Sequence, residues 1–187
     1  MSRSALLVID VQRGAFDGAR CPAIARGHEL IARVRAALAA ARAAKLLVVF
    51  VQHSEPGGVF TEGTPQFALH ESVVPAPGDV QIVKRQSSSF DGTALADTLS
   101  RAAIREVLVC GLQSEHCVYN TVLGALARGL RTVLLSDAHA TWPTATESAE
   151  VISAKINADL GARGAILYST SDLPALLEQG ARQCEGE

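Results

Sequence analysis

Short apolar runs alternate with amphipathic stretches along this chain of 187 residues. Six runs are rich in apolar and β-branched residues and have the length of buried strands, at residues 5–9, 46–51, 81–84, 107–110, 132–136 and 165–168. Between the runs, apolar residues recur at intervals of three and four, which is the spacing of a helix with one buried face. The clearest case lies within residues 28–44, at Leu30, Ile31, Val34, Ala37, Leu38 and Ala41.

This alternation predicts an α/β fold in which a mostly parallel, six-stranded sheet is covered by helices on both faces, as a three-layer α/β/α sandwich of the Rossmann-like kind. Ligands bind beyond the carboxyl ends of the strands in such sheets. One connection, residues 54–79, is long and rich in proline and glycine. A long ordered connection of this kind usually forms a wall or lid of a site.

Composition narrows the class of protein further. Hydrophobic residues make up 48% and charged residues 19%, which predicts one globular domain over residues 1–187 with its core at about 5–180. The net charge of −2 and the lack of a basic block argue against a nucleic-acid partner. No run approaches the ~20 apolar residues of a membrane span, and no signal peptide is recognisable. We therefore expect a cytoplasmic protein without membrane contact.

Cys117 lies where the predicted strand 107–110 has turned into a helix. Helix N-terminal N–H groups would favour its thiolate, with a pKa below the ~8.5 of a free thiol, and could hold a developing oxyanion. The alternative is a small buried apolar residue. Cys110 is expected in the core, and Cys21 and Cys184 as incidental loop and tail residues. Four cysteines without a Cys-x-x-Cys motif fit a reducing compartment.

Two further residues with reactive side chains lie at the ends of predicted strands. Asp10 directly follows the first strand, and Lys84 is the last residue of the third. Asp10 could act as an acid or base, and Lys84 could stabilise both a thiolate and a carboxylate. Taken singly, each has an ordinary explanation, as a turn carboxylate and as a solvated lysine. Because the strand ends of a parallel sheet share one edge, we expect Asp10, Lys84 and Cys117 to meet there.

Five motifs occur in order along the chain: Leu7-Val8-Ile9-Asp10-Val11-Gln12; Ile82-Val83-Lys84 followed by Ser89-Phe90; Gly92-Thr93 with Leu95; Gly111-Leu112-Gln113-Ser114 followed by Cys117-Val118; and Ser136-Asp137-Ala138-His139-Ala140-Thr141. Together they resemble the isochorismatase-like cysteine hydrolase superfamily, from about residue 5 to about residue 175. Each motif alone is weak, whereas their order and spacing are specific.

The resemblance implies a catalytic triad of Asp10, Lys84 and Cys117 that hydrolyses small amides and related C–N bonds through a thioester. It implies a cis peptide between Leu112 and Gln113, with backbone N–H groups of Gln113 and Cys117 forming the oxyanion hole. It also implies a homodimer or homotetramer, a small-molecule amide as substrate and no cofactor.

Three differences from patterns within the family refine this expectation. The family often has Thr where Ser114 stands, and Ser114 keeps the hydroxyl. Isochorismatases proper lack the cysteine, so Cys117 favours amide hydrolysis over vinyl-ether hydrolysis. Nicotinamidases of the family bind a metal through an Asp-x-His pair, and here those positions read Val51-Gln52-His53. Val51 cannot be a ligand, so we expect no metal, and His53 is left to contact substrate or to form part of the rim.

With only 4% aromatic residues, an aromatic side chain near the strand ends is informative. The expected pocket residues are Phe16, Phe90, Gln113, Tyr119 and Trp142, each with plain core packing as the alternative, together with His53, whose alternative is a hydrogen-bonded histidine at the rim. Gln12 is expected to support Asp10 by a hydrogen bond, and Ser114 to support the nucleophile turn. His70 is expected at the surface, and His139 in a structural role. The alternatives to an amidohydrolase are a non-hydrolytic α/β binding module, a thiol redox sensor and an isochorismate-type vinyl-ether hydrolase.

Overall fold

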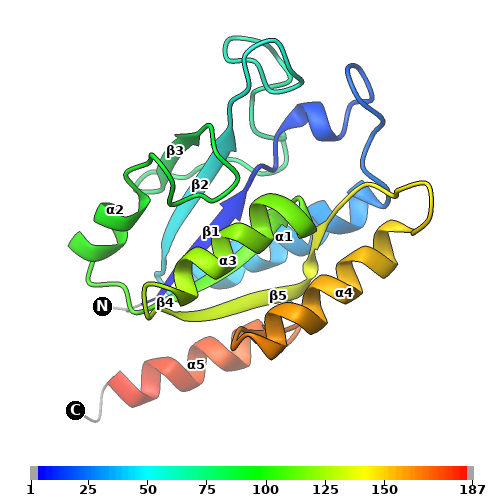
Figure 1. The fold of residues 1–187 in the computed structure, drawn as a ribbon. Helices are drawn as coiled ribbons and strands as arrows, with labels where there is room; N and C mark the ends of the chain where they lie inside the picture. The colour runs from blue at the N-terminus through cyan, green and yellow to red at the C-terminus, as the bar shows by residue number, and fades with distance from the viewer. Residues whose placement is uncertain (1–3, 185–187) are drawn as a thin grey trace.

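The computed structural model describes residues 4–184, and the side chains of residues 4–178 (Figure 1). The strands are β1 Ser4–Ile9, β2 Leu47–His53, β3 Val80–Lys84, β4 Glu106–Leu112, β5 Arg131–Ala140 and β6 Ile166–Tyr168. The α-helices are α1 Gly27–Ala43, α2 Leu95–Arg101, α3 Tyr119–Leu126, α4 Ala149–Ala162 and α5 Leu173–Cys184. A 3₁₀ turn, η1 Arg13–Ala15, follows β1, and a π-helical turn, η2 Ser114–Val118, precedes α3.

The six strands form one sheet in the order β3-β2-β1-β4-β5-β6, and every neighbouring pair is parallel. The predicted α/β fold is therefore confirmed, with a sheet that is wholly rather than mostly parallel. Because all strands run in the same direction, their carboxyl ends lie at one edge of the sheet, which is the upper edge in Figure 1. The connection after β2 and the segment after β1 both rise there.

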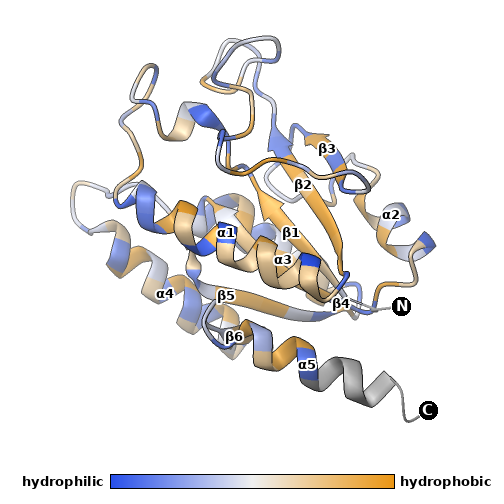
Figure 2. Ribbon diagram, turned by 180° about the vertical axis from the view of Figure 1, so that it is seen from behind, coloured by the Kyte–Doolittle hydropathy of each residue, from blue (hydrophilic) through white to orange (hydrophobic). Residues whose placement is uncertain are grey.

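Alternate residues of each central strand enter two separate cores. Leu6 and Val8 pack with α1 and α5 on one face of the sheet, whereas Leu7 and Ile9 pack with α2, α3 and α4 on the other. Burial on both faces explains why β1 and β2 are hydrophobic over most of their lengths, as Figure 2 shows. The rigid sheet between the two cores holds the strand ends in fixed positions.

Two element boundaries differ from the sequence-based expectations. Strand β5 continues to Ala140, so His139 lies within the strand rather than after it. Thr144 and Glu147 have the spacing of a capping box, which predicts a helix start at Thr144. Helix α4 begins only at Ala149, and its N-cap is Ser148, whose hydroxyl accepts from the backbone of Val151. The Thr144 hydroxyl instead closes a turn before the helix by accepting from the Glu147 N–H. The same side-chain chemistry serves caps and turns, so the pattern did not distinguish them.

Cys184 lies in the last helix, and its side chain is outside the described residues. Over the helices that are described, none has both the length and the apolar character needed to cross a membrane.

Candidate active site

The strand order places four reactive side chains next to one another at the carboxyl edge. Lys84 ends β3, His53 ends β2 in register with Lys84, Asp10 follows β1, and Cys117 lies in the turn after β4. Because β3, β2, β1 and β4 are consecutive neighbours in the sheet, residues up to 107 positions apart in sequence converge. The edge thus combines a carboxylate, an ammonium, an imidazole and a thiol.

The Lys84 ammonium is the centre of this cluster. Its Nζ lies 2.8 Å from Asp10 Oδ2, 3.0 Å from Cys117 Sγ and 3.2 Å from His53 Nδ1. The Lys84 side chain is completely buried. Burial disfavours the charged amine, but the Asp10 carboxylate and the Cys117 sulfur outweigh it and raise the pKa of Lys84. Lys84 is therefore a fixed buried cation that contacts both proposed reacting groups.

Asp10 is held in an unusual backbone conformation. Its φ of 53° is in the left-handed region, and its N–H donates to the carbonyl of Val51. Burial raises the pKa of the Asp10 carboxyl, although Lys84 opposes the shift. Its second oxygen, Oδ1, is buried without a hydrogen-bond partner. A strained residue with a raised pKa and one free oxygen is suited to accept and return a proton.

Cys117 is half-buried in the π-helical turn η2. It directly precedes Val118, the N-cap of α3. The expectation of a lowered thiol pKa is wrong. Burial, followed by the Asp10 carboxylate, raises the pKa of Cys117 to about 11, although Lys84 pulls it down. The pattern of strand and helix could not predict this sign, because it depends on solvent exclusion and on the nearby carboxylate.

This pKa leads to a testable pH dependence. We expect the rate of Cys117 alkylation by iodoacetamide to rise about tenfold per pH unit between about pH 7 and 10, because only the thiolate reacts and a pKa of about 11 keeps it scarce. Peptide mass spectrometry of timed samples measures the rate. Lys84→Gln should slow alkylation further, since it removes the cation that lowers this pKa. A rate that levels off below about pH 8.5 would contradict the raised pKa.

A pocket of about 470 Å³ opens above the cluster. Its lining comes from the strand ends, the η2 turn and four connecting loops, and comprises Asp10, Cys21, Pro22, His53, Glu55, Val59, Phe60, Ser87, Leu112, Gln113, His116, Cys117 and Trp142. The Trp142 indole N–H donates to the Pro22 carbonyl at 2.6 Å and joins two of these loops. The pocket therefore gives a small molecule access to the thiol.

Three aromatic residues that we expected in the pocket lie elsewhere. Phe90 is buried beneath α3, where the Arg128 guanidinium lies 4.4 Å from the centre of its ring. The Tyr119 hydroxyl donates to Asp159 of α4. Phe16 packs edge-on against His70, with the ring centres 4.8 Å apart. Each of these side chains finds a packing partner below or beside the edge, which sequence position alone does not reveal.

The pocket also includes residues that the sequence analysis did not single out. Cys21 lines it, contrary to its expected incidental role, and Glu55, Val59 and Phe60 come from the long connection after β2. The length and the proline and glycine content of that connection predicted that it forms a wall of the site, but did not indicate which of its residues would line the pocket. His70 is partly buried against Phe16 rather than at the surface.

Gln12 supports the site differently from the expectation. Its side chain donates to the carbonyls of His53 and Phe67, and its Oε1 accepts from the His53 N–H at 2.7 Å. No described hydrogen bond joins its side chain to Asp10. The left-handed turn at Asp10 directs Gln12 towards the end of β2, so Gln12 positions His53 and the long connection instead.

A chain of polar side chains supports η2, the turn that holds Cys117. The Ser114 hydroxyl lies 2.8 Å from His139 Nδ1 and 3.0 Å from the Ser153 hydroxyl, and His139 Nε2 lies 2.9 Å from Asn157 Oδ1. Burial lowers the pKa of His139. These contacts join η2 to β5 and α4. At the start of the turn, the peptide bond between Leu112 and Gln113 is cis.

Among the side chains that the structure describes, one group has the composition of a metal site, namely Asp10, His53 and Cys117, whose ligand atoms lie within 4.8 Å of one another. The Lys84 ammonium, however, lies within 3.2 Å of an atom of each of the three. A metal ion bound by them would be placed against this fixed cation. Val51, at the position of the family's Asp ligand, is fully buried in the core. The residues therefore do not fit a metal ion.

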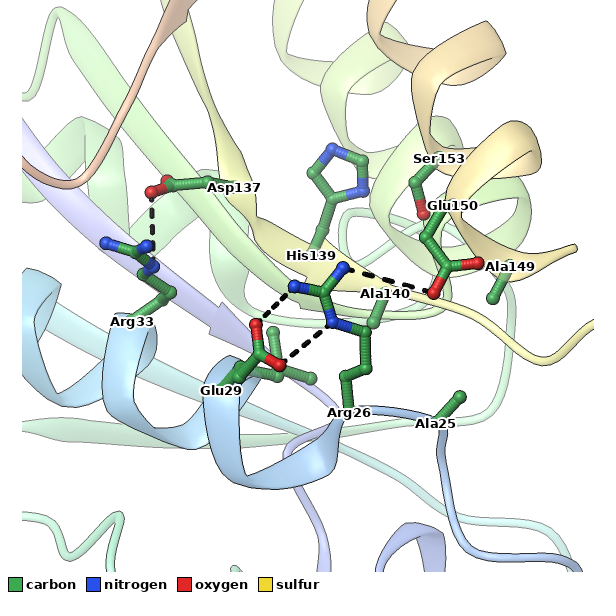
Figure 3. Close-up of a pocket in the computed structure, with 11 residues that line it drawn as sticks. Ala25, Arg26, Glu29, Arg33, Asp137, His139, Ala140, Ala149, Glu150 and Ser153 are labelled. Atoms are coloured by element: carbon green, nitrogen blue, oxygen red, sulfur yellow. Dashed lines mark hydrogen bonds and ion pairs between the residues drawn. The ribbon is translucent and has the colours of Figure 1, made fainter.

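A second pocket of about 220 Å³ lies between α1, β5 and α4 (Figure 3). Its charged groups pair with one another. Arg33 lies 3.4 Å from Asp137, while Arg26 pairs with Glu29 and lies 4.0 Å from Glu150. Such self-compensated charges leave little for a ligand, so the larger pocket is the candidate active site.

Comparison with known proteins places these features in context. Residues 4–171 match the model of the isochorismatase domain. Streptothricin hydrolase of Streptomyces noursei is 42% identical over 139 residues, which are 74% of this chain and 54% of that protein. The chain thus spans about half the length of this curated relative.

In two further comparisons, the match covers a larger share of the related protein. Ureidoacrylate amidohydrolase RutB of Stutzerimonas stutzeri is 27% identical over 172 residues, covering 73% of this chain and 69% of that protein. The crystal structure of a putative isochorismatase from Burkholderia xenovorans superposes with a TM-score of 0.87 at 32% identity, covering 96% of this chain and 89% of that one.

Proposed function

This chain belongs to the isochorismatase family, and from that premise we propose that it is a cysteine-dependent hydrolase of a small amide or related C–N bond. The observation that carries the proposal is the contact of one buried ammonium, Lys84 Nζ, with both Asp10 Oδ2 and Cys117 Sγ. The relatives named as hydrolase and amidohydrolase support the same reaction class.

Proton transfer from Cys117 to Asp10 starts the reaction. The raised thiol pKa means that the resting sulfur carries its proton, and the raised carboxyl pKa makes Asp10 an adequate acceptor. The transfer moves one negative charge from oxygen to sulfur while both stay beside Lys84, so the net charge of the buried cluster is constant. Burial therefore opposes this step much less than it opposes ionisation of the thiol to water.

The sulfur then attacks the amide carbonyl, and the carbonyl π electrons move to oxygen. Backbone N–H groups of Gln113 and Cys117 stabilise this oxyanion. As the tetrahedral intermediate collapses, the C–N bond breaks and Asp10 returns its proton to the leaving amine, which leaves a thioester on Cys117. Water then attacks the thioester and gives a proton to Asp10, and that proton passes to the departing sulfur. The acid product is released and the enzyme is restored.

The thioester is the species to detect. Wild type incubated with a panel of slowly hydrolysed small amides should gain the mass of the acyl group, on the peptide that contains Cys117 and not on the one that contains Cys21. Cys117→Ala should lose this adduct and about 10³-fold or more of the turnover. Equal turnover by Cys117→Ala, or an adduct on Cys21 alone, would contradict the proposal.

A further inference from the structure

The charged groups around the pocket are unequally distributed. Two carboxylates line it, those of Asp10 and Glu55, and no Lys or Arg side chain is among the described residues of its lining. The Asp10 carboxylate is paired at 2.8 Å with Lys84. The other carboxylate, that of Glu55, belongs to the long connection after β2, and no ion pair with it occurs in the part of the chain described. The wall of the pocket therefore carries an uncompensated negative charge.

This carboxylate is held in place by its own loop. Glu55 Oε1 accepts from the backbone N–H of Val59 at 2.8 Å, and both residues line the pocket. Its charge reaches other parts of the lining. The pKa of Cys21 is raised by burial, then by Asp17 and by Glu55. Burial and Lys84 lower the pKa of His53, and Glu55 opposes that lowering. A ligand in the pocket would experience the same field.

Aromatic residues accompany the carboxylate. Phe60 lies on the same loop, with its ring centre 6.3 Å from that of His53, and Trp142, held by its hydrogen bond to Pro22, also lines the pocket. Aromatic faces attract cations, and they do so more strongly when water is excluded. A fixed carboxylate with two aromatic rings is a common arrangement for holding an ammonium or guanidinium group, and it is unfavourable for a carboxylate-bearing ligand.

We propose that this pocket selects amides whose group remote from the scissile bond is a cation, an alkylammonium or a guanidinium, bound by Glu55 together with Phe60 and Trp142. This inference rests on the proposed function, because it assigns the substrate class to the same site. Amides that end in a carboxylate are disfavoured by repulsion from Glu55.

The test compares three amides of equal length that end in an ammonium, a methyl or a carboxylate group. For wild type, kcat/KM should be about 10- to 100-fold higher for the ammonium than for the methyl compound, as expected for a hydrogen bond between charged groups, and lowest for the carboxylate. The difference should appear mainly in KM and shrink as salt is added.

The variant Glu55→Gln removes the charge but keeps the oxygen that accepts from Val59. It should reduce the ammonium-to-methyl ratio to within about threefold. Glu71→Gln, an exposed change in the same connection, is the matched control and should retain the wild-type ratio. Thermal melts of both variants check that the fold is intact.

Different results would contradict the cation preference and the hydrolase activity. Turnover of all three amides at equal kcat/KM, or a preference for the carboxylate, would overturn the cation assignment and leave the hydrolase standing. If none is hydrolysed and no acyl adduct forms, the hydrolase proposal fails. Calorimetric binding of the same amides to Cys117→Ala then decides the charge preference by itself, because equal affinities would overturn it and a preference for the ammonium would support it.

Discussion

Asp10→Asn and Lys84→Met are each expected to lower the free energy of unfolding by about 3 kcal/mol, and the double variant is expected to lose less than either. Each single change leaves one buried charge without its main partner, whereas the double change leaves neither. The carboxylate and the ammonium are 2.8 Å apart, with side chains 5% and 0% exposed. Urea denaturation of the four proteins measures this coupling.

Activity should behave differently from stability in the same four proteins. Asp10→Asn removes the proton acceptor, and Lys84→Met removes the cation that stabilises the sulfur and carboxylate anions. Both single variants and the double variant should therefore lose about 10³-fold or more in kcat. A double variant that regains stability but not turnover would show that the pair is retained for chemistry rather than for folding.

A surface ion pair provides the control for this cycle. Arg163 and Asp159 are also in contact, at 2.7 Å, but their side chains are 51% and 43% exposed. Arg163→Met and Asp159→Asn should show little or no coupling, because solvent screens exposed charges. If the buried pair showed equally weak coupling, or if the double variant were as unstable as the sum of the singles, the proposed electrostatic interdependence would be wrong.

The second large effect is expected at Gly111, where β4 passes the end of β1. Gly111 has φ of +120°, and a Cβ there would lie 2.0 Å from the carbonyl oxygen of Ile9. Gly111→Ala is expected to destabilise the fold by about 4 kcal/mol or more, because the clash is with backbone and can be relieved only by separating two central strands. Circular dichroism during urea titration measures the loss.

Gly129→Ala separates the two causes of this expected loss. Gly129 also has a positive φ, +71°, but a Cβ there would meet nothing within 4 Å. It should cost only about 1–2 kcal/mol, the penalty of a left-handed conformation. Similar losses for the two variants would mean that backbone strain, and not the contact with Ile9, dominates at Gly111.

Local periodicity was sufficient for the architecture because it depends on short-range rules. Leu6 and Leu7 are both apolar because a parallel strand is buried on both faces, and this signal is visible without coordinates. Element boundaries were harder to predict, because the hydroxyl chemistry that caps the start of a helix is also used by turns, as at Thr144.

The lining of the pocket could not be derived in this way. Phe90 and Trp142 looked equivalent as aromatic residues near strand ends, yet Phe90 is covered by α3 and Trp142 reaches across to Pro22. Glu55 and Cys21 enter the site from loops far apart in sequence. Their positions depend on long-range packing, which no spacing rule describes.

Periodicity and short motifs are enough to predict the parallel α/β sandwich, the family resemblance and the positions of Asp10, Lys84 and Cys117 at the ends of their strands. The distances between those groups, the side chains that line the pocket and the raised pKa of the thiol follow only from the folded structure. These properties depend on solvent exclusion and on charges that folding brings together. Residues far apart in the chain contribute to both, so no local pattern reveals them.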